Sequence, residues 1–542
     1  MKIRRALLTV SDKTDLVPLG RALAASGAEL VATGKTAVVL KEAGLKVTPI
    51  EEVSGSPEAF QGRMKTLSFP VCSGILYRRG DASDEKDLKT LSIAAIDCVV
   101  VNFYPFEAAA AREGISRREL IEEVDVGGPT LVRAAAKNAP DVLVLTSPAQ
   151  YGEVIAALGG RATGGSSTGG SSTGGGKSDS APGEIPAELA HRCAEAAWER
   201  VLSYDAAIAR ELGGRGKRVL RYGENPHQKG FLEFDPSGPI AWEESLTATE
   251  LSYNNILDLS GAYGLASDLI ALGGGTHTGV VIVKHNNPCG VTMIPKSTPQ
   301  AQKLALMRAW EGDPVSAFGG VLVFTDPIED EVASWLSERF VELVAAPGLE
   351  KAKGALAILS AKRKNLKAVA IRRFGEVPAE SMVVVPGGRL FQTSDLGTGE
   401  ALKSVTRREW PADKQTLTQF GIAVCRALKS NALAIVREIP EAPGCLQLVG
   451  TGQGQPNRVE ALERLAIPRT QAVLRASEGR IADCVLVSDA FFPFRDTVDV
   501  AYQAGLRFVV QPGGSMKDAE SIAACDEHGM AMVFTGVRHF RH

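Results

Sequence analysis

Short apolar runs alternate with longer amphipathic stretches along the first part of the chain. The runs ALLTV, AELVA, IDCVVVNFY and DVLVLTS are separated by segments with helical periodicity, such as VPLGRALAASG. Strands that alternate with helices in this way are typical of an α/β domain with a parallel sheet. We therefore predict a doubly wound domain over residues 1–158.

The same alternation returns in the second half. The strand-like runs GVVIVKH, GGVLVF, FVELVAA, CVLVSDAFF, FVVQPGG and MAMVFTG stand between helical segments. Several of these runs end directly in polar residues, and ligands of open α/β sheets collect outside the carboxyl ends of the strands. Lys284, Asp489 and Arg538 are therefore candidate site residues in a second α/β region over residues 217–542.

The two regions are separated by a segment with almost no apolar side chains. Residues 159–183 contain the repeat TGGSSTGGSSTGGG, which predicts a flexible linker. A Gly/Ser coil of about 25 residues has an end-to-end distance of roughly 28 Å. Helical periodicity then runs from Ile185 to Leu212 and stops at two glycines, so a connecting helix is expected within residues 184–216.

Composition narrows the class of protein. A chain of 542 residues exceeds what one hydrophobic core usually organises, and its 44% hydrophobic and 23% charged residues are typical of globular domains. A formal net charge of -3 produces no long-range positive field that would attract nucleic acid. Anionic ligands must therefore be held by local clusters of Lys, Arg and backbone N–H groups. Eight cysteines without a CxxC pair, no secretory leader and no apolar run of about 20 residues favour the cytoplasm over a membrane or an oxidising compartment.

Seven strings in the second half carry the most specific signal. They are, in order, RYGENPHQ (221–228), ELSYNNILD (250–258), VKHNNPCG (283–290), DPVSAFGG (313–320), SDAFFPFRD (488–496), QPGGS (511–515) and the terminal RHFRH. Together they resemble the phosphoribosylaminoimidazolecarboxamide (AICAR) formyltransferase family. The resemblance implies two cytidine deaminase-like α/β subdomains and a homodimer with shared active sites.

Four strings in the first half point to a second activity. SDKT (11–14), GRMKTL (62–67), VVVNFYPFE (99–107) and DVGGPTLVRAAAKN (125–138) resemble the inosine monophosphate (IMP) cyclohydrolase domain, whose fold is like that of methylglyoxal synthase. The two resemblances cover nearly the whole chain outside the linker. They imply a cytosolic enzyme of purine biosynthesis that formylates AICAR with 10-formyltetrahydrofolate as cosubstrate, giving formyl-AICAR (FAICAR), and then cyclises FAICAR to IMP with loss of water.

Formyl transfer needs a base for a weakly nucleophilic amine and a donor for the oxyanion on the formyl carbon. Lys284 and His285 are the candidates for these two roles. Because adjacent residues of a strand point to opposite faces, both side chains can reach one reacting group only if the strand has ended and the backbone turns. Asn286, Asn287 and Pro288 indicate such a turn. By resemblance, His285 accepts the proton and Lys284 stabilises charge or protonates the departing folate nitrogen. Asn431 then orients the formyl oxygen.

The resemblance also implies two sets of binding residues. The ribonucleotide set is Arg221, Tyr222, His227, Asn255, Phe318, Gly319, Arg538 and Phe540. The folate set is Arg458, Phe491, Pro493, Phe494 and Asp496, in which aromatic rings offer a stacking face for the pterin and the carboxylate binds its edge. The alternative reading of FFPF is that it simply belongs to the hydrophobic core.

Ring closure is intramolecular, so a cyclohydrolase mainly has to fold its substrate, stabilise an oxyanion and move protons. The positions that match the family's catalytic residues are Lys65, Tyr104, Asp125 and Lys137. Its nucleotide-binding loops match Ser11, Lys13, Thr33, Gly34, Thr36, Arg63, Thr66 and Asn102. Loops that follow strands and open helices expose N–H groups that suit a phosphate.

The first half departs from the family pattern at two places. Lys35 stands where the family has a second glycine, and LSFPVCSG (67–74) replaces LHPKVHGG. All four catalytic positions remain, which favours a bifunctional enzyme. A monofunctional AICAR formyltransferase with a weakened or inactive cyclohydrolase domain is the first alternative, and a nucleotide sensor without turnover is the second.

Three common motifs are not supported. The GKT at Gly34 is no P-loop, because that motif needs glycine where Glu29 stands, and the glycines from 450 to 454 lack GxGxxG spacing. The PCG at Cys289 lacks the second cysteine and the upstream HxE of zinc deaminases. We therefore expect no catalytic metal, whereas a structural potassium ion is allowed by the resemblance.

Overall fold

The structure, a computed structural model, describes residues 1–542 except 61–62, 113, 160–182, 215, 244, 248, 363–364, 398–399 and 478. The predicted linker over 159–183 therefore lies almost entirely outside the described residues. The chain divides into two compact units, Met1–Gly214 and Arg215–His542. Each unit is built around its own sheet.

The first unit contains a five-stranded parallel sheet with the order β3-β2-β1-β4-β5. Its strands are β1 (Arg5–Val10), β2 (Glu29–Ala32), β3 (Val47–Pro49), β4 (Cys98–Asn102) and β5 (Leu143–Leu145). The chain moves outward from β1 to β3 and then crosses to β4 and β5 on the other side of β1. The predicted doubly wound domain is confirmed, and its switch point lies between β1 and β4.

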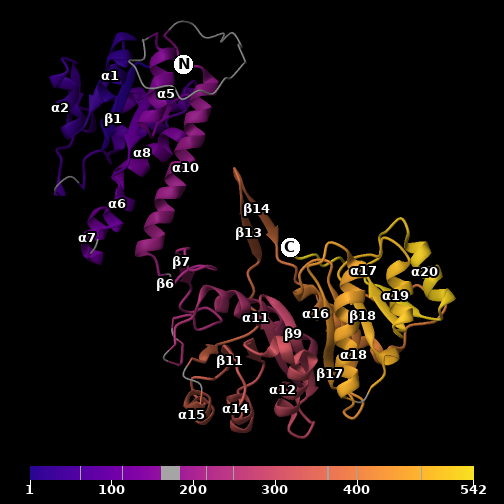
Figure 1. The fold of residues 1–542 in the computed structure, drawn as a ribbon. Helices are drawn as coiled ribbons and strands as arrows, with labels where there is room; N and C mark the ends of the chain where they lie inside the picture. The colour runs from indigo at the N-terminus through magenta and orange to yellow at the C-terminus, as the bar shows by residue number, and fades with distance from the viewer. Residues whose placement is uncertain are drawn as a thin grey trace. The chain divides into compact units, whose positions relative to one another are not determined.

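Helices cover both faces of this sheet (Figure 1). They are α1 (Leu16–Ala25), α2 (Gly34–Glu42), α3 (Ile50–Ser54), α4 (Phe69–Leu76), α5 (Ala82–Thr90), α6 (Phe106–Ala110), α7 (Arg117–Glu122), α8 (Gly127–Lys137), η2 (Pro148–Gln150), α9 (Tyr151–Ala157) and α10 (Ala187–Leu212). The long helix α10 packs on β5 and α8. Leu189 and Cys193 contribute to the core beside α1 and α9, whereas Val201 and Tyr204 contribute to the core beside α4 and α8. The helix expected in the connecting segment is thus integral to the first unit.

The second unit contains an eleven-stranded mixed sheet with the order β12-β11-β10-β8-β9-β17-β16-β18-β19-β20-β15. Its strands are β8 (His277–Lys284), β9 (Asn287–Pro295), β10 (Val321–Phe324), β11 (Leu343–Pro347), β12 (Lys367–Ile371), β15 (Lys403–Ser404), β16 (Leu433–Glu438), β17 (Leu446–Gly452), β18 (Val485–Ser488), β19 (Phe508–Gln511) and β20 (Ala531–Phe534). The order β9-β8-β10-β11-β12 is repeated as β17-β16-β18-β19-β20, with the same parallel and antiparallel pairs. The second unit therefore consists of two halves of one topology, joined where β9 pairs with β17.

Helices also repeat between the two halves. One face of the sheet is covered by α11 (Tyr253–Gly273) and α16 (Gln415–Ala427). The other face is covered by α12 (Ala301–Gly312), α13 (Pro314–Ala317), α14 (Asp330–Ser337) and α15 (Lys353–Lys362) in the first half, and by α17 (Arg458–Glu460), η4 (Ala461–Ala466), α18 (Ile467–Ala476), η5 (Ile481–Asp483), α19 (Asp496–Gln503) and α20 (Asp518–Glu527) in the second. Among the described residues, α11 is long and apolar enough to cross a membrane. Its packing against β8, β10 and α16 accounts for that composition, because it is a core helix.

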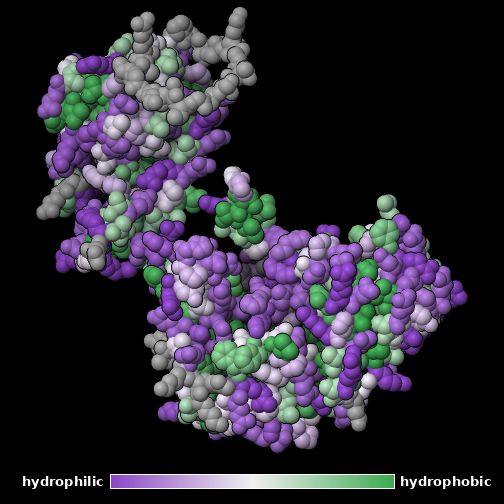
Figure 2. Space-filling view, in the orientation of Figure 1, coloured by the Kyte–Doolittle hydropathy of each residue, from purple (hydrophilic) through white to green (hydrophobic). Residues whose placement is uncertain are grey.

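Two hairpins project from the second unit. They are β6 (Gly216–Leu220) with β7 (Gly230–Phe234), and β13 (Glu380–Val385) with β14 (Gly388–Thr393). The short helix η3 (Ala412–Lys414) precedes α16. Apolar side chains of the β13–β14 hairpin remain exposed, among them Val384 at 72% and Phe391 at 64%, and Figure 2 shows them as an apolar projection.

Candidate active sites

The predicted turn after the lysine and histidine is present in the second unit, one residue earlier than expected. β8 ends at Lys284 and β9 begins at Asn287, and these two residues pair across the hairpin. The two residues between them, His285 and Asn286, have left-handed φ angles of 52° and 59°. Positive φ at both positions defines the tight two-residue turn of type I′. The lysine therefore ends the strand and the histidine occupies the turn.

A carboxylate on α11 holds this turn in place. Asp258 accepts hydrogen bonds from the backbone N–H of His285 at 3.3 Å and of Asn286 at 2.5 Å. Burial raises the pKa of Asp258, and the two N–H donors oppose that rise. The Lys284 ammonium donates to the carbonyl of Phe318 at 2.7 Å, which brings the DPVSAFGG segment beside the turn.

The second half of the unit contributes the loop that contains Asn431. The backbone N–H of Lys429 donates to Oδ1 of Asn287 at 3.3 Å, and the Asn431 amide donates to the carbonyl of Gln455 at 2.6 Å. Asn431 also has a left-handed φ of 58°. Left-handed backbone at non-glycine residues is uncommon and concentrates at functional sites, and it occurs here at His285, Asn286 and Asn431 together.

The C-terminal tail joins both halves at this place. The Arg541 guanidinium donates to the carbonyl of Ala427 at 2.8 Å and to Oδ1 of Asn286 at 3.3 Å. The Ser430 N–H donates to the carbonyl of Arg541 at 2.7 Å. Burial lowers the pKa of Arg541. The sequence analysis missed Arg541 as a site residue, although it lies within the RHFRH string.

Arg458, expected in the folate set, lies in an ion pair inside the unit. Its side chain is 8% exposed, and its guanidinium donates to Asp489 at 2.8 Å and to the carbonyl of Phe491 at 3.2 Å. Asp489, a candidate from its place at a strand end, is 1% exposed. Burial raises the pKa of Asp489, and the charge of Arg458 opposes that rise. This buried ion pair therefore holds the loop that contains Phe491. The Arg458 guanidinium also lies 6.0 Å from the centre of the Phe540 ring.

The FFPF string is divided between core and surface. Phe492 is fully buried, whereas Phe494 is 51% exposed and Pro493 is exposed. The Lys517 ammonium lies 4.6 Å from the centre of the Phe494 ring, a contact that the sequence analysis missed. Asp496, the first residue of α19, is also exposed. The reading of this string as wholly core is therefore wrong for Phe494, which presents an open ring face.

The expected ribonucleotide residues lie in two settings. Arg221, Tyr222 and His227 are on the surface loop between β6 and β7, and the Asn254 amide ties this loop to α11 by donating to the carbonyl of Glu224 at 3.4 Å. Asn255 is 2% exposed, and its amide donates to Glu342 at 2.8 Å. The sequence analysis missed Glu342. Arg538 lies 4.7 Å from the Phe540 ring in the tail, and Phe318 is 57% exposed beside Gly319.

In the first unit, the loop that contains Lys65 and Thr66 packs over the starts of two helices. A methyl group at Gly34, which opens α2, would lie 2.8 Å from the Lys65 ammonium, and one at Gly127, which opens α8, would lie 2.9 Å from the Thr66 hydroxyl. Glycine thus allows both close approaches. Lys65 also pairs with Glu58 at 2.9 Å, beside a cavity of about 280 Å³.

Asp125 lies next to this loop at the start of α8. Its carboxylate accepts the N–H of Gly128 at 2.8 Å, and its own N–H donates to the hydroxyl of Tyr204 at 2.8 Å. Burial raises the pKa of Asp125, and the N–H groups of Gly128 and Tyr104 oppose that rise. Lys137 is the last residue of α8, about 15 Å from its first residue at 1.5 Å per residue. The structure therefore brings Tyr104 and Asp125 together, with Thr66 beside the start of α8, whereas the Lys65 ammonium lies at the start of α2 and Lys137 ends α8.

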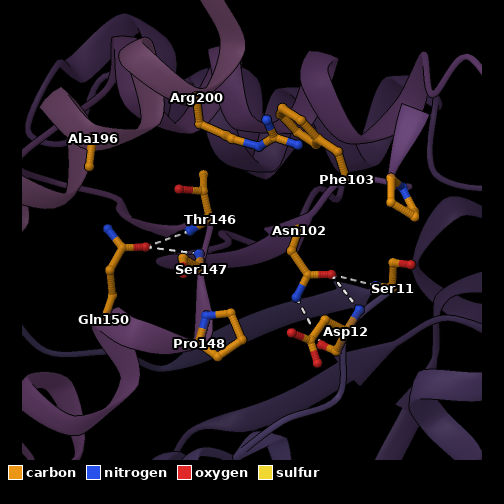
Figure 3. A pocket seen from close by; sticks show the side chains of 11 residues that line it. Ser11, Asp12, Asn102, Phe103, Thr146, Ser147, Pro148, Gln150, Ala196 and Arg200 are labelled. Carbon is orange, nitrogen blue, oxygen red and sulfur yellow. Dashed lines mark hydrogen bonds between the residues drawn. The ribbon is translucent and has the colours of Figure 1, made fainter. Parts of the chain in front are cut away.

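The expected nucleotide loops meet at the switch point of the first sheet. Asn102 ends β4, and its side-chain oxygen accepts the N–H of Ser11 at 2.5 Å and of Asp12 at 2.8 Å after β1 (Figure 3). A cavity of about 500 Å³ opens there, with Arg200 stacked 5.3 Å from the ring of Phe103. Lys13 donates to the carbonyls of Val10 and Ser11.

The remaining residues of that set have distinct settings. Thr33 and Thr36 are buried beside β1, with hydrogen bonds to Thr9 and Val10, and Arg63 pairs with Glu122 on the surface. The divergent segment LSFPVCSG forms the beginning of α4, for which Ser68 is the N-cap and accepts the N–H of Val71 at 3.4 Å. Lys35 is exposed on α2.

Metal ligands were not expected at either site. Within the part of the chain that the structure describes, no group of three or more His, Cys, Asp and Glu side chains could hold a metal ion. Cys289 lies in the β8–β9 hairpin, where its thiol donates to the carbonyl of Ile282 at 3.5 Å.

Comparison with known proteins gives concordant matches. The family model described as AICARFT/IMPCHase bienzyme matches residues 177–469, and the MGS-like domain model matches residues 15–130. Three relatives named bifunctional purine biosynthesis protein PurH match over their full length. The protein of Synechococcus elongatus is 39% identical, and the match covers 99% of this chain and 100% of the relative. The protein of Magnetococcus marinus is 39% identical, and the match covers 100% of both chains. The protein of Aquifex aeolicus is 38% identical, and the match covers 99% of this chain and 100% of the relative. A solved structure, the crystal structure of ForH, matches 38% of this chain and 97% of its own at 32% identity, with a TM-score of 0.31.

Proposed function

Because the chain belongs to the AICARFT/IMPCHase bienzyme family, we propose that it transfers a formyl group from 10-formyltetrahydrofolate to AICAR and then cyclises FAICAR to IMP with loss of water. The observation that carries the proposal is the meeting of the β8–β9 turn, the Asn431 loop and the C-terminal tail through direct hydrogen bonds. Full-length relatives are named bifunctional, so the monofunctional alternative has no support from them.

In the formyl-transfer step, the AICAR amine attacks the formyl carbon and the folate nitrogen leaves. His285 accepts the amine proton, Lys284 stabilises the oxyanion or protonates the leaving nitrogen, and Asn431 orients the formyl oxygen. Asp258 supports these roles, since it fixes the backbone of the turn from which the histidine projects. Preorganised donors of this kind need no rearrangement as charge develops.

Exposed groups around this site serve substrate binding. The open face of Phe494, with Lys517 beside it and Asp496 nearby, suits the pterin of the folate. Arg538 and Phe540, with Arg221, Tyr222, His227, Phe318 and Gly319, bind the ribonucleotide. The buried groups Arg458 and Asn255 act through neighbours, since they hold the Phe491 carbonyl and Glu342.

Ring closure is assigned to the first unit. Tyr104 and Asp125 lie at the start of α8 and Lys65 at the start of α2, and the first turn of a helix favours negative charge. The raised pKa of Asp125 suits a group that exchanges protons with substrate. Ser11, Lys13, Thr33, Gly34, Thr36, Arg63, Thr66 and Asn102 form or support the nucleotide loops. The role of Lys137 rests on resemblance alone.

The oligomeric state, the cellular location and the structural relationships of the enzyme are also proposals. A homodimer is favoured by the exposed apolar side chains of the β13–β14 hairpin. A cytoplasmic location is favoured by the eight free cysteines. The cytidine deaminase-like identity of the two halves, and a structural potassium ion without assigned ligands, are carried by resemblance.

Supplying the two substrates separately tests this assignment. With AICAR and 10-formyltetrahydrofolate, Lys284→Ala should form no FAICAR, yet the same variant should convert added FAICAR to IMP. Lys65→Ala should still form FAICAR from AICAR but should not convert FAICAR to IMP, so FAICAR should accumulate. The assignment fails if either variant loses both activities while its circular dichroism spectrum is unchanged. Lys137→Ala, measured in parallel, decides whether that lysine acts in ring closure.

A further inference from the structure

A histidine in the C-terminal tail points into the protein between two exposed site residues. His539 is 4% exposed, whereas Arg538 and Phe540 on either side are exposed. Its backbone N–H donates to the carbonyl of Asp489 at 2.9 Å. The tail beyond β20 has no helix or strand, so such anchors fix the direction of its side chains.

Both ring nitrogens of His539 face carboxylates. Nδ1 lies 2.8 Å from Oδ2 of Asp395, and Nε2 lies 3.3 Å from Oε1 of Glu400. Within the described residues, Nδ1 makes a hydrogen bond to Asp395, whereas Nε2 has only the ion-pair contact with Glu400. Burial alone would raise the pKa of Asp395, but the hydrogen bond and charge of His539 hold it below its usual value.

The surrounding charges make His539 difficult to replace. The Glu400 side chain is 4% exposed, and within the described residues its two oxygens have no hydrogen-bond partner. Arg426, the other cation of the cluster, pairs with Asp268 at 2.5 Å and donates to the carbonyl of Gly397. Without the His539 ring, Asp395 would lose its hydrogen bond and Glu400 its ion-pair contact, and a buried carboxylate without a partner is costly.

A second contact between a histidine and a carboxylate, at His528, differs from that of His539 in its surroundings. His528 lies 2.8 Å from Asp499, but it caps the regular helix α20 and stacks on Tyr502. Its position is fixed by secondary structure. His539 instead holds an irregular segment whose neighbours belong to the proposed ribonucleotide set, and it links that segment to Asp395, two residues beyond β14.

We propose that His539 is a positioning residue for nucleotide binding: seated between Asp395 and Glu400, it fixes the tail so that Arg538 and Phe540 face the formyl-transfer site. This inference rests on the proposed function. It predicts an effect on affinity for the ribonucleotide, because His539 itself does not face the reacting groups.

The test measures formyl transfer by the full chain against AICAR concentration at saturating folate, together with the Kd for AICAR by calorimetry. His539→Leu should raise KM and Kd about tenfold while kcat changes less than threefold, which corresponds to about 1.4 kcal/mol of binding. His539→Asn, which restores a donor near the Nδ1 position, should recover part of the affinity. His528→Leu is the matched control and should leave both constants unchanged.

Asp395→Asn addresses the same contact from a side chain that is 43% exposed, and it should weaken AICAR binding in the same direction even if His539→Leu folds poorly. The proposal is overturned if Asp395→Asn and a folded His539→Leu both bind AICAR within twofold of the natural chain, or if kcat falls while KM and Kd stay constant. A natural chain that formylates nothing defeats the proposed function instead, and the Kd values alone then decide the role of His539.

Discussion

At the scale of single residues, the formyl-transfer site depends on backbone that few side chains adopt. The VKHNNPCG string predicts a turn, and the structure has it at His285 and Asn286, before Pro288 enters β9. The anchor of this turn, Asp258, is 27 residues away in the chain, and no local pattern indicates that contact. For the same reason the burial of Arg458 and Asn255 could not be read from their motifs, since burial is a property of the packed unit.

Asn431 provides a matched pair of substitutions. Asn431→Gly removes the side chain and tolerates the φ of 58°, whereas Asn431→Ala removes the side chain and keeps the strain. Both should lower kcat for formyl transfer at least tenfold. Both lose the hydrogen bond to Gln455, and Asn431→Ala should lower the free energy of unfolding by about 1–2 kcal/mol more than Asn431→Gly in calorimetric unfolding. Equal activity of Asn431→Gly and the natural chain would show that the amide does not orient the formyl group.

Asp258→Asn tests the anchor of the turn. An amide has one acceptor oxygen and no charge, so both N–H groups of the turn lose a charged partner and one of them loses its acceptor, and a hydrogen bond to a charged group is worth about 1.5–3 kcal/mol. We expect kcat for formyl transfer to fall about tenfold or more in initial-rate assays, with FAICAR cyclisation unchanged. Asp235→Asn, at another carboxylate that accepts a backbone N–H in a surface turn, is the control. Unchanged kcat in Asp258→Asn would contradict this role.

At the scale of elements, the sequence pattern predicts the first sheet well and the second only in part. The first sheet is parallel, and alternation of strands and helices is the pattern of such sheets. The second sheet contains the antiparallel pairs β8–β9 and β16–β17, and the β8–β9 turn at His285 and Asn286 carries no glycine signal. β9, β12, β16 and β17 were not among the predicted strands.

Gly450 and Gly452, which lack the spacing of a dinucleotide-binding motif, allow close packing of helices on β17. A methyl group at Gly452 in β17 would clash with the carbonyl of Ala461, and one at Gly450 would clash with the Thr470 hydroxyl. Gly452→Ala should thus push η4 from the sheet and lower the free energy of unfolding by about 1–3 kcal/mol. Gly264→Ala, in α11 with open space around it, should raise it by about 0.5–1 kcal/mol. Calorimetry of both variants checks this, and equal unfolding temperatures would contradict the close packing.

At the scale of the whole molecule, each proposed activity has its own unit and its own sheet. The formyl-transfer residues come from both halves of the second unit, which meet where β9 pairs with β17, so neither half contains the site alone. The repeated strand order was not visible in the sequence, because the matching strands share topology rather than residues. The motifs identified both activities, whereas only the fold shows which side chains are exposed enough to meet a ligand.

The β13–β14 hairpin leads to a prediction about assembly. Its exposed apolar side chains, including Met382, Val383 and Leu390, are costly in water unless a partner covers them. Light scattering during size-exclusion chromatography should therefore give about twice the chain mass of 57.3 kDa. Val384→Lys together with Phe391→Lys should shift the mass toward one chain. A natural chain that is monomeric at micromolar concentration would contradict the homodimer.

One chain is expected to perform both reactions, and a mass-spectrometric time course of the natural chain with AICAR and 10-formyltetrahydrofolate is the decisive measurement. FAICAR should appear first and transiently, and IMP should follow until AICAR is consumed. Accumulation of FAICAR without IMP would contradict the assignment of ring closure to the first unit, and the absence of any formylated product would contradict the claim as a whole.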